Sequence, residues 1–589
     1  MDGTPRFSRL PMPTNAPMEI KMEPASSAEC DVLVIGSGAS GMAAAIVARH
    51  FGLDVLVVEK AATFGGTTAI SGGWVWAPGN QLAAAEGIVD NAEAAGTYLR
   101  NLTGEHFNEE RVGVFLANAP RMIEFFLKNT AVRFVCPTTA PDYHAELPGG
   151  VQAGRALMTE PYDGRLLGPY LKKIHPPLAE LTVLGLMLGP GKDVAHFMRA
   201  TRSIVSAAYV AWRLARQALD MLRYGRGMLL SNGNALAARL ARTALDLGIP
   251  VWLSSPAREL VTTDGIVTGA LVEKGGRRVQ VRARRGVVLA CGGFTHDDVR
   301  RRALFPAISS GNAYASPVPH ESSGDGVRMA ESQGGWVDAN LAEPAAWVPV
   351  SLVPYPDGTR RPFPHFIGRA RPGVIAVNRR GERFVDESLS YHEFVRALAK
   401  QCDPTDAVAF LVCDYRSVRR YGLGIAKPAP FPLSPYLHSG YLLRGDSLEA
   451  LATQAGINPA QFSATVHAYN AEARNGRDPQ FGKGSTHYGR YMGDAMHQPN
   501  PCIAPIEDAP FFAVKVVPSD LGTFAGIKTD TNARVLRQNG EIVTGLYAVG
   551  NDMVSIMGGK YPGAGAVLGS AMTFGFIAGC HLAGREPAA

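Results

Sequence analysis

The arrangement around a glycine-rich turn near residue 36 limits the folds open to this chain more than any other feature. A short apolar run, Asp31–Ile35, precedes the turn, an alanine-rich segment suited to a helix follows it, and a second apolar run ends at Glu59. The turn itself consists of Gly36, Ser37, Gly38, Ala39, Ser40 and Gly41. Short apolar runs on both sides of a helical segment are typical of neighbouring parallel strands that are buried on both faces. The stretch therefore predicts a β–α–β unit of an α/β protein.

Each glycine of the turn has its own physical task in binding a dinucleotide. Gly36 permits the tight turn, Gly38 lets the backbone approach a pyrophosphate, and Gly41 allows the helix to pack closely on the strand. The helix then begins at the phosphates with unpaired N–H groups and the positive end of its dipole. Glu59 stands 18 residues after Gly41, where a carboxylate can accept hydrogen bonds from ribose hydroxyls. The spacing predicts a dinucleotide cofactor, which at this point is either NAD or FAD.

A second loop and two distant strands favour FAD over NAD. The loop after Lys60 is small and hydroxyl-rich, so that a flat ring system can lie against its backbone. Its predicted cofactor contacts are Gly66, Thr67, Thr68, Ser71, Gly72 and Gly73. Apolar strands that end in glycines also occur at 285–293 and at 545–552. From the second strand and the segment after it, we expect contacts by Gly550, Asn551 and Leu568.

The position of these strands predicts how the cofactor domain is assembled. One lies far down the chain and the other near its end, which indicates a cofactor domain built from both ends with another domain inserted between them. This two-ended pattern favours FAD. Because the loop after Lys60 contains neither His nor Cys, we expect the FAD to be bound non-covalently.

Composition removes several classes of protein. The 589 residues are 46% hydrophobic and 19% charged, which excludes a disordered or collagen-like chain. The net charge of +6 is too small for this length to indicate a nucleic-acid partner. The 7 cysteines form no CxxC pair, which argues against a disulfide framework or a structural metal site and favours a reducing compartment, the cytoplasm. Residues 1–29 lack the apolar segment of an export signal, and we expect a flexible leader there.

With these motifs in place, the sequence resembles the flavoproteins that group soluble fumarate reductases with 3-ketosteroid Δ1-dehydrogenases. Besides the glycine-rich turn and the loop after Lys60, the resemblance rests on Ser323–Gly326 and Val377–Glu387. It implies a Rossmann-type FAD-binding domain made of 30–300 and 513–589. An α+β substrate domain, 301–512, would be inserted between these two parts.

Three segments separate the two branches of this family. In the fumarate reductases, an arginine that donates a proton follows an Arg-Phe-x-x-Glu segment, whereas the matching position here is Tyr391. The segment Tyr561–Gly565 is similar to the YPGxG segment of the ketosteroid dehydrogenases. Tyr143 precedes a Pro-Gly-Gly sequence and in this resembles their early active-site tyrosine. The resemblance therefore favours the steroid branch.

The resemblance also implies a role for four residues in oxidising a carbon–carbon bond beside a ketone. The Tyr561 hydroxyl and the Gly565 backbone N–H would hold the C3 carbonyl of a 3-ketosteroid, because the developing enolate oxygen needs well-placed donors. Tyr391 would take the proton from C2 as the general base. Tyr143 would hydrogen-bond to Tyr391 and ease its ionisation. The hydride from C1 would pass to flavin N5, giving a 1,2-desaturated product.

Other functions stay open from the sequence alone. The YPGAG segment would serve a 3-oxo-5α-steroid 4-dehydrogenase equally well, since the pose of the substrate decides which bond is oxidised. A fumarate-reductase-like alkene reductase is a further alternative, but this sequence lacks the proton-donating arginine of those enzymes and has Tyr391 in its place. A non-catalytic flavin electron-transfer protein would leave Tyr561 and Gly565 without a task. No motif identifies the electron acceptor, which could be a quinone or a redox protein.

The segment 199–226 predicts a helix that has two interpretations. It combines six arginines and one aspartate with many apolar residues. Such a helix can pack on the protein, with the arginine stems covering apolar surface. It can also lie on an anionic membrane, which would put the protein at the inner face of that membrane. The packed arrangement is the more common one among helices with an apolar stripe, and the sequence favours it.

Overall fold

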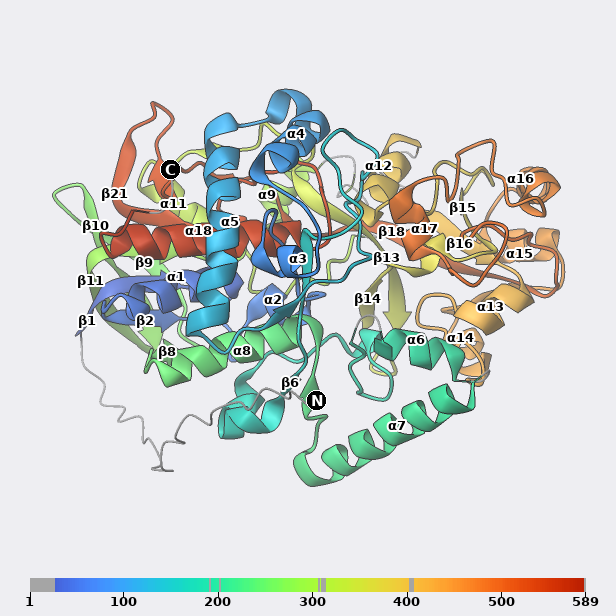
Figure 1. The fold of residues 1–589 in the computed structure, drawn as a ribbon, viewed down its shortest axis with the longest axis horizontal. Helices are drawn as coiled ribbons and strands as arrows, with labels where there is room; N and C mark the ends of the chain where they lie inside the picture. The colour runs from blue at the N-terminus through green and yellow to red at the C-terminus, as the bar shows by residue number, and fades with distance from the viewer. Residues whose placement is uncertain are drawn as a thin grey trace, which may run out of the picture.

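A mostly parallel sheet organises one side of the molecule, at the left in Figure 1. The computed structural model describes residues 27–189, 192–200, 203–305, 308, 314–401 and 407–586. β1 (Ser27–Ile35) pairs in parallel with β2 (Val55–Val58) and with β11 (Arg277–Leu289). The other strands of the sheet are β8 (Val251–Trp252), β9 (Ala257–Thr263), β10 (Ile266–Lys274), β20 (Arg534–Leu536) and β21 (Ile542–Ala548). The apolar runs of the sequence thus form the buried centre of this sheet.

Both ends of the chain meet in the parallel sheet. β21 pairs in parallel with β11, which lies next to β1. α18 (Ala566–Leu582) packs on α1 (Ala39–His50) through glycines. A Cβ at Gly575 would lie 2.4 Å from the Ser40 carbonyl oxygen, so that only glycine allows the two helices to come this close. The cofactor-type domain is therefore assembled from both ends, in the α/β arrangement that the sequence predicts.

An antiparallel sheet organises the other side, at the right in Figure 1. Its strands are β13 (Ala345–Pro354), β14 (Arg360–Pro364), β15 (Val374–Asn378), β16 (Ala409–Cys413), β17 (Leu443–Gly445) and β18 (Phe511–Thr523). The long strand β18 pairs with both β13 and β16 and runs across the predicted domain limit between 512 and 513. The division into 30–300, 301–512 and 513–589 stays a prediction. Of the predicted leader, residues 1–26 lie outside the described residues, and β1 begins at Ser27.

The remaining elements that matter for the site are short or lie at its border. They are α2 (Gly66–Ile70), β3 (Trp74–Trp76), α8 (Asn232–Asp246), α12 (Tyr391–Gln401) and α17 (His487–Met492). Two further helices are α6 (Lys192–Arg199) and α7 (Ile204–Tyr224), and in Figure 1 α7 lies at the lower edge of the molecule with α6 above it. Within the part of the chain that the structure describes, no helix is long and apolar enough to cross a bilayer.

Candidate active site

A cavity of about 830 Å³ lies where the carboxyl ends of β1, β2 and β11 approach the antiparallel sheet. This edge of a parallel sheet is where α/β proteins bind their ligands. Most of the predicted cofactor residues line it, namely Gly36, Gly38, Ala39, Ser40, Glu59, Lys60, Gly66, Thr67, Thr68, Ser71, Gly72, Gly73, Gly550, Asn551 and Leu568. Ser37 and Gly41 do not line the cavity. They contact residues that do, because Ser37 binds Glu59 and Gly41 packs against Gly36.

The glycine-rich turn is shaped as its spacing predicts. Gly36 has a φ of +114°, and a Cβ there would lie 2.1 Å from the Ala290 carbonyl oxygen. A Cβ at Gly41 would lie 2.3 Å from the Gly36 carbonyl oxygen, so Gly41 serves close packing. At Gly38 the nearest atom to an added Cβ, Thr68 Oγ1, is 3.8 Å away, and the backbone there borders open cavity. Because Gly38 is the N-cap of α1 and has no capping side chain, the helix start is available to an anion such as a pyrophosphate.

Glu59 is held in place by the backbone around it. Its Oε2 accepts hydrogen bonds from the Ser37 N–H at 2.9 Å and the Ser37 hydroxyl at 2.7 Å. Its Oε1 accepts from the Ala61 N–H at 2.8 Å. A carboxylate has about four acceptor positions, so Glu59 keeps capacity for ribose hydroxyls on its cavity side. Ser37 therefore supports the cofactor site through Glu59.

Lys60 lines the cavity, but its ammonium is engaged elsewhere. The Nζ atom donates to the Ser323 hydroxyl at 2.7 Å and forms an ion pair with Asp325 at 2.8 Å. These partners belong to the Ser-Gly-Asp-Gly segment on which the family resemblance partly rests. The side chain of Lys60 thus joins two distant motifs at the border of the cavity.

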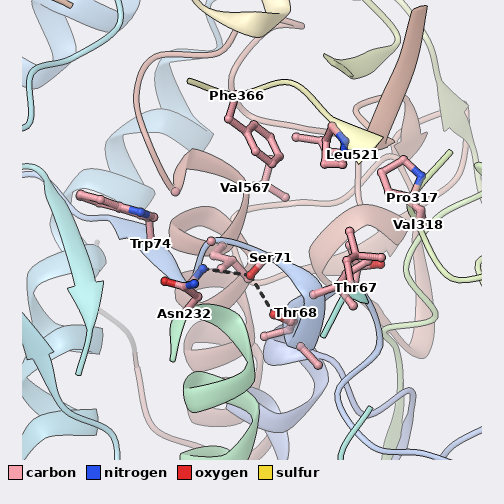
Figure 2. A pocket seen from close by; sticks show the side chains of 18 of the residues that line it. Thr67, Thr68, Ser71, Trp74, Asn232, Pro317, Val318, Phe366, Leu521 and Val567 are labelled. Atoms are coloured by element: carbon pink, nitrogen blue, oxygen red, sulfur yellow. Dashed lines mark hydrogen bonds between the residues drawn. The ribbon is translucent and has the colours of Figure 1, made fainter. Parts of the chain in front are cut away.

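The hydroxyl-rich loop lies against the start of α1 through Thr68, and Figure 2 shows Thr67, Thr68 and Ser71 of this loop at the cavity. Thr68 Oγ1 accepts a hydrogen bond of 3.0 Å from the Ala39 N–H, and the Ser71 hydroxyl donates to the Thr68 carbonyl oxygen at 2.8 Å. Trp74 borders the same space (Figure 2). A helix start with glycine at its N-cap, a buried carboxylate and a largely apolar cavity together fit a flavin dinucleotide.

Asp552 is a site residue that the sequence prediction left out. Its two carboxylate oxygens accept hydrogen bonds from the Cys291 N–H at 2.6 Å and the Gly293 N–H at 2.9 Å. Burial raises the pKa of Asp552 to about 6, against the lowering effect of those backbone hydrogen bonds. The residue ties the ends of β11 and β21 together beneath the cavity. Its position directly after Gly550 and Asn551 was a signal that could have found it.

Three buried tyrosines from distant parts of the chain meet at the cavity. Tyr143 follows β4 (Phe134–Val135) in a loop, Tyr391 is the first residue of α12, and Tyr561 stands in the loop before α18. The Tyr143 hydroxyl donates to the Tyr391 hydroxyl at 3.1 Å. The ring centroids of Tyr561 lie 5.5 Å from Tyr143 and 5.4 Å from Tyr391. All three side chains line the cavity, as does Gly565.

The surroundings of these tyrosines favour neutral phenols in the resting protein. Burial raises the pKa of Tyr143 and of Tyr391 well above the usual range of a tyrosine. Burial also raises the pKa of Tyr561, while a hydrogen bond with Tyr391 partly opposes that rise. Tyr561 is therefore suited to donating a hydrogen bond. Ionisation of Tyr391 needs a donor to its oxygen, and Tyr143 provides one.

The loop that contains Tyr561 and Gly565 is fixed by its backbone. The Tyr143 N–H and the Tyr98 hydroxyl both donate to the Pro562 carbonyl oxygen, at 2.9 Å and 2.6 Å. The Trp76 N–H donates to the Gly565 carbonyl oxygen at 3.1 Å. Gly565 has a φ of +87°, in the left-handed region that favours glycine. The backbone of this loop is therefore held in place by contacts within the protein.

Two more residues of the tyrosine cluster were not predicted. The ring of Tyr488 lies 4.5 Å from that of Tyr143, is buried, and borders the cavity. The fully buried guanidinium of Arg369 donates to the carbonyl oxygens of His365 and Glu387. Its positive charge opposes the rise that burial causes in the pKa of Tyr488. Neither residue carries a recognisable motif, since each reaches the site only through contacts between distant segments.

Comparison with known proteins agrees with this geometry. The model of the FAD binding domain family matches residues 31–568 of the chain. The chain therefore belongs to this family of FAD-binding flavoproteins. Within it, the chain is an FAD-dependent oxidoreductase that acts on CH–CH bonds, of the group that contains the ketosteroid dehydrogenases and fumarate reductases. The predicted fold and the predicted FAD cofactor are confirmed.

Three relatives cover almost the whole chain. The 4-oxocyclohex-2-ene-1-carboxylate 5-dehydrogenase of Sinomonas cyclohexanicum is 42% identical over 96% of each chain. The 3-oxosteroid 1-dehydrogenase of Mycobacterium tuberculosis (strain ATCC 25618 / H37Rv) is 37% identical, over 94% of this chain and 98% of that protein. The crystal structure of 3-ketosteroid Δ1-dehydrogenase from Sterolibacterium denitrificans with 1,4-androstadiene-3,17-dione is similar with a TM-score of 0.86, at 35% identity, covering 95% of this chain and 100% of that chain.

Proposed function

We propose that this protein desaturates the C1–C2 bond of ring A of a 3-ketosteroid. The observation that carries the proposal is the tyrosine cluster, in which Tyr391 accepts a hydrogen bond from Tyr143 and lies against the ring of Tyr561 in one cavity. A base and a carbonyl-binding donor side by side are what removal of a proton alpha to a ketone requires.

The proposed mechanism assigns one task to each residue. The Tyr561 hydroxyl and the Gly565 N–H donate to the C3 carbonyl oxygen and stabilise the negative charge that develops there. Tyr391 takes the proton from C2, and the Tyr143 hydroxyl holds the oxygen of Tyr391 while it is ionised. Bound FAD supplies the acceptor for the hydride that leaves C1. Electrons then pass to an acceptor that we take to be a quinone or a redox protein.

The wall of the cavity beyond the tyrosines supports a steroid. Its apolar residues include Leu178, Leu181, Met187, Phe366, Ile367, Met492 and Met496. Three arginines also border the cavity, namely Arg199, Arg371 and Arg420, and the last two have partners. Arg420 forms an ion pair with Asp494 at 2.6 Å, and Arg371 donates to the Gly493 carbonyl oxygen at 2.5 Å. The largely apolar wall suits a fused-ring ketone.

A second candidate substrate is 4-oxocyclohex-2-ene-1-carboxylate, which the Sinomonas relative named above acts on. The chemistry would be the same, because that molecule is also a ring ketone. Its carboxylate would pair with the exposed Arg199, or would draw Arg371 or Arg420 away from its present partner. Oxidation at C4–C5 of a 5α-3-ketosteroid would use the same Tyr561 and Gly565. An alkene reductase is disfavoured because Tyr391 stands where the family's arginine acid would be.

Anaerobic reduction of the purified yellow protein tests the proposal directly. We expect androst-4-ene-3,17-dione to bleach the flavin absorption band rapidly, with loss of two hydrogens to the 1,4-diene in the mass spectrum. Bleaching by a 5α-saturated 3-ketone alone, with a 4-ene product, would move the chemistry to C4–C5. Bleaching by 4-oxocyclohex-2-ene-1-carboxylate alone would replace the steroid with the small acid. No bleaching with any of the three would contradict the proposed function.

A further inference from the structure

Helix α7 buries its polar face and exposes its apolar face, which is the reverse of an ordinary surface helix. Its buried residues are all polar, namely Ser206, Arg213, Gln217 and Asp220. They recur at the three- and four-residue intervals that place side chains on one face of a helix. A helix at the edge of a water-soluble protein normally buries its apolar face instead. The apolar face of α7 therefore points away from the rest of the described chain.

Ion pairs and hydrogen bonds hold α7 in this orientation. Arg213 pairs with Asp193 of α6 at 2.7 Å, and Asp193 also accepts from the Tyr209 hydroxyl. Asp220 pairs with Arg165 at 2.9 Å and accepts from the Met228 N–H at 3.2 Å. Rotating the helix to bury its apolar side would expose or break these contacts. The outward position of the apolar face is thus built into the packing.

The outward face is apolar and large. Its exposed bulky residues are Ile204 at 90%, Val205 at 73%, Trp212 at 55%, Leu219 at 67% and Leu222 at 86% exposed. Exposed alanines fill the spaces between them, at Ala207, Ala208, Ala211, Ala215 and Ala218. An exposed apolar surface of this extent marks a site of contact with a protein or a membrane.

The charges around this face identify its partner. Arg199 at the end of α6 and Arg223 near the end of α7 are exposed, and Arg216 lies beside the ring of Trp212 at 5.9 Å. The one acidic residue of α7, Asp220, is buried and paired. A second copy of the chain would bring the same arginines against each other, whereas anionic lipid headgroups would neutralise them. Tryptophan and arginine beside an apolar face are also typical of helices that lie in a membrane interface.

We propose that α7 lies in the surface of an anionic lipid bilayer, with its apolar face toward the acyl chains. Arg199, Arg216 and Arg223 would contact the phosphate groups of the lipids. This orientation replaces the packed helix that the sequence favoured, because the structure buries the polar face of α7 against the protein.

The proposed membrane face continues into the border of the cavity. Ala195 and Arg199 of α6 line the cavity, and so does Leu181, which is 39% exposed. Leu184, between these segments, is 71% exposed. A water-insoluble ketone could therefore pass from the bilayer to the tyrosines without crossing bulk water. This consequence rests on the proposed function, whereas the membrane contact does not depend on the substrate.

Sedimentation of the flavin-loaded protein with lipid vesicles tests the proposal. We expect the full chain to pellet with vesicles of phosphatidylglycerol and phosphatidylcholine, and far less with phosphatidylcholine alone. The double variant Leu219→Glu/Leu222→Glu should lower the bound fraction by about ten-fold or more, since it puts two charges on the inserted face. The variant Arg216→Glu/Arg223→Glu should lose the preference for phosphatidylglycerol. Flavin content and the far-UV circular dichroism spectrum verify that each variant is folded.

The variant Val299→Glu is the matched control. Val299 of α9 (Asp298–Leu304) is 83% exposed but lies on another helix, so its variant should bind vesicles like the unmodified protein. Three results would overturn the proposal. They are absence of binding to either kind of vesicle, undiminished binding of Leu219→Glu/Leu222→Glu, or a dimer in solution that this double variant dissociates. The last result would assign the face to a second copy of the chain.

Discussion

The Tyr143 hydroxyl donates a hydrogen bond of 3.1 Å to the Tyr391 hydroxyl across 248 residues of sequence. The direction of this bond suits a base that must carry negative charge, because a donor stabilises a phenolate. The ring of Tyr561 lies against both tyrosines, so the proposed base and the proposed carbonyl donor share one wall of the cavity. The predictions below follow from this cluster and from the cofactor site beside it.

Removal of the Tyr391 hydroxyl should abolish most of the activity without loss of the flavin. We expect Tyr391→Phe to lower the rate of flavin reduction by ketosteroid by about 10² to 10⁴-fold, the usual contribution of a general base. Anaerobic stopped-flow absorbance measures this rate. Tyr469→Phe is the control, because Tyr469 is also buried but does not line the cavity. Equal rates in Tyr391→Phe and the unmodified protein would remove Tyr391 from the mechanism.

The rate should rise with pH. Burial raises the pKa of Tyr391 well above the usual range, so the ionised form is scarce at neutral pH and increases as the pH rises. We therefore expect log kcat/KM to climb without a plateau up to about pH 10, the reference pKa of tyrosine. Steady-state assays over this range, at constant ionic strength, measure the slope. Tyr391→Phe should flatten the profile, and a rising limb that persists in this variant would assign it to another group.

Gly565→Ala should damage the loop that we propose to hold the substrate carbonyl. An added Cβ would lie 2.4 Å from the Trp74 carbonyl carbon, in addition to the strain of a φ of +87°. We expect a loss of more than about 1 kcal/mol in the free energy of unfolding, together with a higher KM. Gly358→Ala is the matched control, since Gly358 has a φ of +80° but no atom within 4 Å of an added Cβ. Urea denaturation and steady-state kinetics compare the two, and similar effects would mean that crowding at Trp74 is unimportant.

Glu59→Gln should weaken FAD binding. The three protein hydrogen bonds that Glu59 accepts would lose their charged acceptor, and one amide N–H₂ would face donors. We expect the dissociation constant of FAD to rise about ten-fold or more, because a buried donor is left unpaired. The ratio of flavin to protein absorbance after dialysis reports the loss. Glu273→Gln, which changes an exposed carboxylate paired with Arg258, should retain FAD, and equal retention in both variants would contradict the role of Glu59.

The parts of the site that lie close together in sequence could be predicted from it. Gly36, Gly38 and Gly41 are neighbours on the chain, and their effect on the backbone is local, so the spacing alone indicates the turn. Glu59 follows from the length of one helix and one strand. For these residues, the path from the sequence to the cofactor site involves no long-range contact.

The remainder depends on contacts that the sequence pattern does not encode. Tyr488 reaches Tyr143 only because α17 packs beside a loop that is more than 300 residues away in the chain. The apolar residues of α7 recur at helical intervals in the sequence. Which side of the helix is buried, however, is decided by the ion pairs that Asp193 and Arg165 form with it. The sequence favoured a packed helix because apolar faces are usually the ones that are buried.

The pairing of β21 with β11 has a consequence for how the protein matures in the cell. The segment that contains Gly550, Tyr561 and Gly565 leaves the ribosome more than 500 residues after the glycine-rich turn. Until then, the nascent protein has the glycine-rich turn but lacks one wall of the cavity and the proposed donor for the substrate carbonyl. Capture of the flavin is therefore coupled to the synthesis of this segment, and a chain terminated before it would be colourless.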